Sequence, residues 1–179
     1  MRVAALLVAG VLALGPAAAE AAIRLYAYDP ANAATREAAG GLTFEFKQKL
    51  IFNTVLSLRS TVGQAKAELA PADEKALGGG LAPLIGEGAP ERDLYEVKPE
   101  DDGEALVRAL CPGEARRGFL AFGRLRANRP LRVHVLAVDG AGAPRLCRTL
   151  DFQFRAEWPM PRDNPRVTAR DLKQPRFPH

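Results

Sequence analysis

The sequence predicts an antiparallel α+β domain, with a β-sandwich as the alternative, and two observations lead to this fold class. Short segments in which apolar and polar residues alternate recur along the chain, as in "AAIRLYAYDP" and "LRVHVLAV". One strong helix pattern, "PEDDGEALVRALCPG", lies between them. Turn-forming residues separate the segments by distances that suit antiparallel connections, so we expect one domain over residues 22–158.

The first 21 residues have the layout of a secretory signal peptide. Arg2 precedes an apolar run from Val3 to Leu14, and small residues follow up to Ala21. The run is shorter than the roughly 20 residues that a membrane-spanning helix needs. We therefore expect an exported chain, in the periplasm or outside the cell, with no transmembrane segment in its mature form.

The first half of the domain alternates between clear and ambiguous segments. Residues 23–28 and 42–47 alternate apolar and polar side chains and predict strands. A helix over 46–58 is the alternative to a second long strand there. Residues 31–41 predict a loop with one helical turn, and residues 64–70 fit either helix or strand. Pro71 to Gly78 predicts a short helix, and residues 93–97 predict a strand.

The second half predicts one helix and three strands. Acidic residues before Leu106 and the Pro112-Gly113 pair after Leu110 mark the two ends of the helix. Strands follow at 118–126, 131–138 and 145–158. For the first two we predict a hairpin that pairs Phe122 with Val135 and Leu120 with Ala137, because a register shifted by one sets like charges opposite each other. In the last strand we expect a core face from Leu150 to Trp158. The proline-rich residues 159–179 predict a disordered tail.

Cys111 and Cys147 are the only cysteines, and we expect a disulfide between them. Exported chains with two cysteines most often join them. The 36-residue separation excludes a C-x-x-C redox motif. A zinc site or a nucleophilic cysteine would depend on His134, the only histidine within the predicted domain.

No pattern of catalytic residues stands out. Ser57 and Ser60 lie outside any G-x-S-x-G motif, and we expect His134 to be a solvated or hydrogen-bonded histidine within a strand. The sequence predicts no catalytic residue, no metal site and no cofactor. Acidic residues gather in the segment 87–104. The simpler interpretation is that they belong to a solvated loop and the start of a helix. The alternative is that they serve a carboxylate-based hydrolase.

The feature with the strongest functional implication is an arginine-rich hairpin. No acidic residue occurs between Arg116 and Arg132, and four arginines gather at the predicted turn: Arg124, Arg126, Arg129 and Arg132. We expect this end of the hairpin to project into solvent. Such a patch binds anionic polymers, lipid headgroups or acidic protein surfaces, although it can also merely keep a hairpin soluble. The sequence favours a non-catalytic interaction domain with an unknown protein or anionic envelope component as partner, and not nucleic acid.

Overall fold

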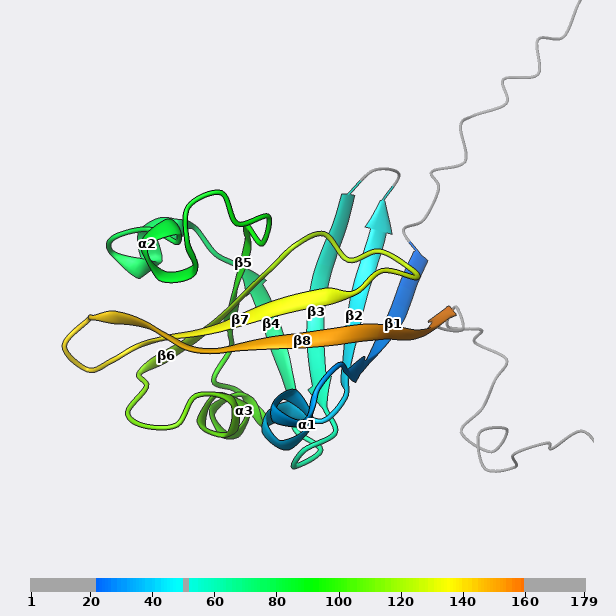
Figure 1. Cartoon of the computed structure of the whole chain (residues 1–179), viewed down its shortest axis with the longest axis horizontal. Coiled ribbons are helices and arrows are strands. Elements are labelled where there is room, and N and C mark those ends of the chain that lie inside the picture. Colours follow the sequence, from blue (N-terminus) through cyan, green and yellow to red (C-terminus); the bar gives the residue numbers. More distant parts are fainter. Residues whose placement is uncertain (1–21, 50–51, 160–179) are drawn as a thin grey trace, which may run out of the picture.

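The computed structural model describes residues 22–49 and 52–159 (Figure 1). The signal peptide predicted for residues 1–21 lies outside this range. The tail predicted for 159–179 also lies outside it, except for Pro159, which ends the last strand. None of the helices in the described part of the chain is long and apolar enough to span a membrane.

Eight antiparallel strands form a closed barrel in which each strand pairs with its neighbours in sequence and the last pairs with the first. The strands are β1 (Ala22–Pro30), β2 (Leu42–Lys49), β3 (Phe52–Ser60), β4 (Lys66–Pro71), β5 (Asp93–Val97), β6 (Arg117–Phe122), β7 (Leu131–Val138) and β8 (Pro144–Pro159). The predicted α+β class and the sandwich alternative are therefore wrong, as is the helix over 46–58. The segment 64–70, which the sequence left open, contributes β4.

Strand β8 closes the barrel because it is long enough to pair with two strands. Its first part pairs with β7 and its second part pairs with β1, and Phe152 lies opposite both Leu131 and Pro30. Register shifts interrupt both ladders, between Val135 and Leu136 on β7 and between Ala27 and Tyr28 on β1. Because such bulges bend a strand and increase its twist, they let one long strand serve two sides of the barrel.

In the described part of the chain, four short helices lie in the connections between strands. They are α1 (Ala33–Ala39), the 3₁₀ helix η1 (Glu74–Leu77), α2 (Ala82–Ile85) and α3 (Gly103–Leu110). Residues 31–41 contain two turns of helix where the sequence predicted one, since the Asn32 side chain accepts a hydrogen bond from Thr35 N and caps α1. The short helix predicted from Pro71 to Gly78 forms as η1 and ends at Gly78 as predicted, but it begins later: Pro71 ends β4, and Asp73 caps η1.

Aromatic side chains fill the interior of the barrel. Tyr26 packs edge-on against Phe46, with ring centroids 4.6 Å apart, and Tyr95 stacks on Phe122 at 5.0 Å. An eight-stranded barrel is wide enough for packed side chains or for one small ligand, and here side chains fill it. The predicted core face of β8 is only partly correct: Leu150 and Phe152 are buried, but Trp158 at the strand's end is 46% exposed.

A second apolar cluster covers the outside of β5, β6 and β7. Leu77 of η1 and Leu81 before α2 pack with Leu94, Phe119 and Leu136, which point away from the barrel interior. These three strands are therefore buried on both faces. The segment from Ala72 to Arg92 acts as their cover, which explains why "GFLAF" and "VHVLAV" show little polar alternation.

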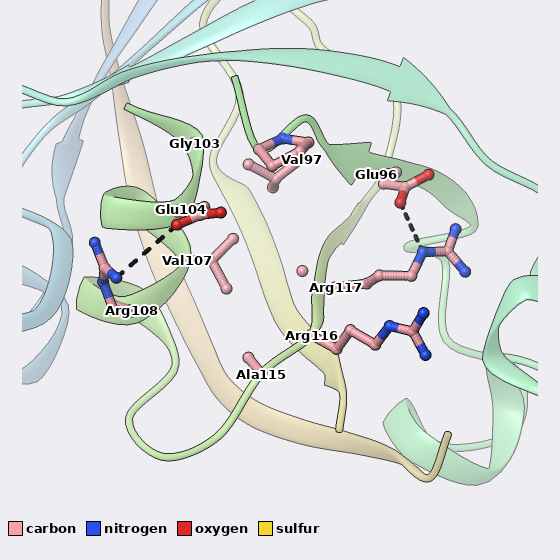
Figure 2. Close-up of a pocket in the computed structure, with 11 residues that line it drawn as sticks. Glu96, Val97, Gly103, Glu104, Val107, Arg108, Ala115, Arg116 and Arg117 are labelled. Carbon is pink, nitrogen blue, oxygen red and sulfur yellow. Dashed lines mark hydrogen bonds and ion pairs between the residues drawn. The ribbon is translucent and has the colours of Figure 1, made fainter. Parts of the chain in front are cut away.

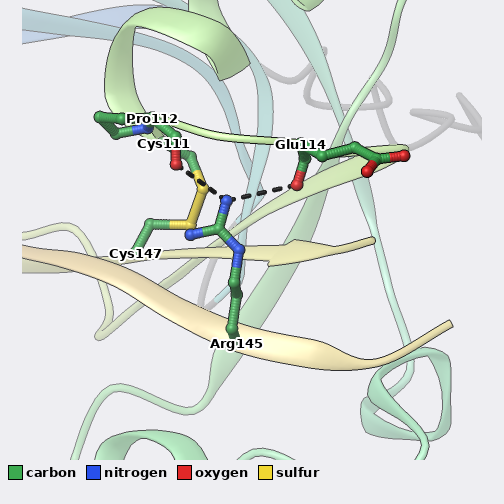
Figure 3. Close-up of a disulfide and its surroundings, with 5 residues drawn as sticks. All are labelled: Cys111, Pro112, Glu114, Arg145 and Cys147. Atoms are coloured by element: carbon green, nitrogen blue, oxygen red, sulfur yellow. Dashed lines mark hydrogen bonds between the residues drawn. A yellow bond between two sulfur atoms is a disulfide. The ribbon is translucent and has the colours of Figure 1, made fainter. Parts of the chain in front are cut away.

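The two cysteines form the predicted disulfide next to the end of the barrel that α1 and α3 cover (Figures 1 and 3). Their Cα atoms are 5.1 Å apart. Cys147 is the extra residue of the bulge between Val135 and Leu136, and a bulge redirects a side chain from the alternation of its strand. This lets Cys147 reach the buried Cys111 at the end of α3. Beside the bond, Arg145 donates hydrogen bonds to the carbonyl oxygens of Pro112 and Glu114, at 3.0 and 3.3 Å.

Candidate functional site

The loop between β6 and β7, residues 123–130, carries three of the four predicted site arginines, and we call it the arginine loop. It does not project into solvent as a hairpin end. The Tyr28 hydroxyl donates to the Arg126 carbonyl at 3.5 Å, and Asn53 Nδ2 donates to the Leu125 carbonyl at 3.3 Å. The Leu125 side chain is 3% exposed. The loop is therefore folded back over the end of the barrel opposite α1 and α3 (Figure 1).

The predicted hairpin register is also wrong. Phe122 lies opposite Val133 and Leu120 opposite Val135, two residues away from the expected partners. The physical reason is the length of the connection: β6 ends at Phe122, so residues 123–126 leave the sheet instead of extending it. Burial of Leu125 and two hydrogen bonds to the loop's carbonyls replace the strand pairing that the sequence predicted.

The four predicted arginines are all exposed, but they differ in their contacts. Arg132 Nε lies 2.8 Å from Asp151 Oδ1, and hydrogen bonding to this carboxylate raises the pKa of Arg132. Arg124 lies beside the mouth of the barrel and has interactions of its own. Arg126 and Arg129 have no ion-pair partner within residues 22–49 and 52–159. These two guanidinium groups are the ones available to an incoming anion.

A pocket of about 290 Å³ opens under the arginine loop, and we call it the mouth pocket. Its apolar wall combines the stacked rings of Tyr95 and Phe122 with Val55 and Leu125, all of which are buried. Its polar rim consists of Asn53, Asp93 and Arg124. Binding sites often occupy the mouths of barrels and combine an apolar wall with a few polar groups.

The mouth pocket is not among the sites that the sequence predicts, although one signal for it is present. Asp93 and Tyr95 share a strand phase, as do Phe122 and Arg124. A charged residue in phase with buried aromatic residues, at the end of a strand, indicates where an apolar face meets solvent.

A larger pocket, of about 370 Å³, lies between α3 and strands β5 and β6 (Figure 2). It contains two carboxylates of the predicted acidic segment, and each faces an arginine: Glu96 Oε1 lies 2.7 Å from Arg117 Nε, and Glu104 lies 4.0 Å from Arg108. Hydrogen bonding to Arg117 is the main cause that lowers the pKa of Glu96. A carboxylate held in its charged form is a poor proton donor, so Glu96 does not suit the role of the acid in glycoside hydrolysis.

The rest of the acidic segment is distributed over separate places. Asp102 Oδ2 accepts a hydrogen bond from Lys66 N, Asp93 lies at the mouth pocket, and Glu91 lies beside His134. No group of three or more His, Cys, Asp or Glu side chains that could hold a metal ion occurs in the part of the chain that the structure describes.

His134 is buried, so the expectation of a solvated histidine is wrong, whereas its alternative, a hydrogen-bonded histidine, agrees with the structure. Its ring lies on the outer face of β7, with Nδ1 3.0 Å from Thr149 Oγ1 and Nε2 3.6 Å from Glu91 Oε2. The ring is 6% exposed because the covering segment from Ala72 to Arg92 passes over this face. None of the best-formed pockets in the described region has His134 in its lining.

Comparison with known proteins gives no match: no family model, no curated protein and no solved structure is significantly similar to this chain.

Proposed function

We propose that this domain is a non-catalytic binding module of an exported protein, and that it recognises an anionic surface on a partner through the arginine loop. The observation that supports this function most directly is the state of Arg126 and Arg129. Both are exposed, and neither has an ion-pair partner in the described residues. The backbone between them and the barrel is fixed by Tyr28, Asn53 and the buried Leu125.

A fixed loop matters because binding costs conformational entropy. Ordering a flexible loop on binding uses part of the interaction energy, whereas a loop that is already fixed does not pay this cost. Arg126 extends from backbone that the barrel holds in place, and Arg129 follows it in the same loop. Their charges attract an anionic surface over a range of about 8–10 Å at physiological ionic strength.

The disulfide supports the part of this proposal that concerns export. Bonds of this kind form and persist in oxidising compartments such as the bacterial periplasm. The partner is then a protein or an anionic component of the cell envelope or its exterior. The alternative function, a carboxylate-based hydrolase, has no supporting observation in the pocket between α3 and strands β5 and β6. Glu96 and Glu104 both face arginines there.

Binding to fluorescein-labelled poly-L-glutamate, measured by fluorescence anisotropy at low and high NaCl, tests this function. The variant Arg126→Gln/Arg129→Gln should bind about 3- to 10-fold more weakly at low salt, since exposed charge pairs contribute about 0.2–1 kcal/mol each. The matched control is Arg36→Gln/Arg59→Gln, which removes the same charge from exposed arginines outside the loop. Equal loss of binding in both variants would show attraction to net charge alone and would contradict a site on the loop.

A further inference from the structure

Strand β4 leaves β3 halfway along its length and continues as the partner of β5. Residues 66–68 of β4 pair with β3, from Arg59 to Ser57. From Leu69 onward β4 pairs with β5 instead, with Leu69 opposite Val97 and Pro71 opposite Tyr95. Residues 53–56 of β3 therefore have β2 on one side and no paired strand in the described structure on the other. We call this unpaired stretch of β3, within an otherwise closed barrel, the open edge.

The open edge carries backbone hydrogen-bonding groups without a strand partner, although Val55 within it is 2% exposed. Successive residues of a strand direct these groups alternately to its two sides, so about half of those in residues 53–56 point away from β2. Tyr95 of β5 lies across the opening. Burial raises the pKa of Tyr95, and interaction with the Val55 backbone partly offsets this rise. The phenol thus occupies one point on the edge, but no strand occupies the rest.

The mouth pocket lies directly behind this edge. Asn53 and Val55 line it from β3, and Asp93 and Tyr95 line it from β5, on the opposite side of the opening. An apolar side chain entering from the edge would contact the stacked Tyr95 and Phe122 rings. An apolar side chain suits this pocket because its wall is apolar, consisting of Val55, Tyr95, Phe122 and Leu125.

We propose that the anionic partner binds through an extended peptide segment, which adds a strand to residues 53–56 of β3. Its backbone pairs with the open edge, an apolar side chain enters the mouth pocket, and acidic residues beside it contact Arg126 and Arg129. This inference rests on the proposed function and names the partner's binding segment. An extended peptide fits the three features together: strand addition supplies affinity through the backbone, and pockets for alternate side chains supply specificity.

Three peptides of equal charge test the proposal on the full chain by fluorescence anisotropy. The first alternates Glu with Val, the second has the same sequence with N-methyl groups on its central amides, and the third pairs its Glu residues with Gly. N-methylation removes backbone donors and changes neither charge nor side chains. The first peptide should bind about tenfold more tightly than the other two, since methylation removes backbone hydrogen bonds and glycine removes the apolar contact. Hydrogen exchange in β3 should slow only with the first peptide.

The possible results separate the two proposals. If all three peptides bind equally and Arg126→Gln/Arg129→Gln weakens them equally, strand addition is wrong and the arginine loop remains the binding site. If the N-methylated peptide binds as tightly as the first, and both bind more tightly than the glycine peptide, the pocket alone recognises the ligand. The inferred pairing with β3 is then overturned. If the loop variant binds every peptide as tightly as the parent chain does, the proposed function fails as well.

Discussion

Gly118 of β6 lies so close beneath Val107 of α3 that a β-carbon at this position would overlap the valine side chain. The added carbon would lie 2.9 Å from Cγ1 of Val107 and closer still to Cγ2. Gly103, at the start of α3, lies against the Lys98 carbonyl in the same way. Two glycines thus let the helix pack directly on the ends of β5 and β6.

We predict that Gly118→Ala destabilises the domain by about 1–3 kcal/mol, the usual cost of overpacking. The variant Gly118→Ala/Val107→Ala should recover part of this loss, because the smaller side chain on α3 makes room for the new methyl group. Urea unfolding followed by circular dichroism measures both. A Gly118→Ala variant as stable as the parent chain would mean that α3 does not pack against β6.

Removal of the disulfide should cost about 3–4 kcal/mol, the loop-closure entropy expected for a bond between residues 36 apart. The test is Cys111→Ser/Cys147→Ala, compared with the oxidised parent chain by urea unfolding. Because the bond joins the end of α3 to β8, peptides from α3 should also exchange their amide hydrogens faster in the variant. Unchanged stability and exchange would show that the Arg145 contacts and the packing of α3 hold this region without the bond.

Local patterns in the sequence predicted most of the strands but not their arrangement. Alternation placed Leu42, Phe44 and Phe46 on one face, and the structure buries all three. Barrel closure depends on contacts between β1 and β8, more than 100 residues apart, which no local pattern encodes. The length of the alternating run from Leu146 to Trp158 was the available clue, since a strand that long can pair with two neighbours.

The candidate site was predictable in its charges but not in its shape. The arginines between β6 and β7 are evident in the sequence, and their exposure follows from their type. Their placement over the barrel mouth depends on Tyr28 and Asn53, which come from strands far away in the sequence. Similarly, the opening beside β3 results from the change of partner of β4, and its six residues carry no signal for that change.

The buried tyrosines should make the domain sensitive to alkaline pH. Burial raises the pKa of Tyr28 well above its usual value of 10.0, so the folded state keeps its proton after the unfolded state has lost it. The stability that this group contributes is fully present below pH 10 and is lost as the pH rises above it. Tyr28→Phe should therefore lose less stability than the parent chain between neutral pH and about pH 11. At neutral pH the variant should lose only about 0.5–1 kcal/mol, for one long hydrogen bond. Parallel pH profiles of urea midpoints for the two proteins would contradict this.

Leu125 should hold the arginine loop in place more than any other side chain of the loop. It is 3% exposed and packs with the barrel core, whereas the arginines on either side of it point into solvent. Leu125→Ala should cost about 2–3 kcal/mol, the low end for a buried leucine, because the end of the barrel can partly close around the smaller side chain. Release of the loop should also expose the bonds after Arg124 and Arg126 to trypsin, so native-state digestion should cut there faster than in the parent chain. The matched control is Leu146→Ala, at a leucine that is 38% exposed, which should change stability little and leave the loop resistant. If Leu125→Ala unfolds more easily but the loop is cut no faster, the hydrogen bonds from Tyr28 and Asn53 suffice to fix the loop without its buried leucine.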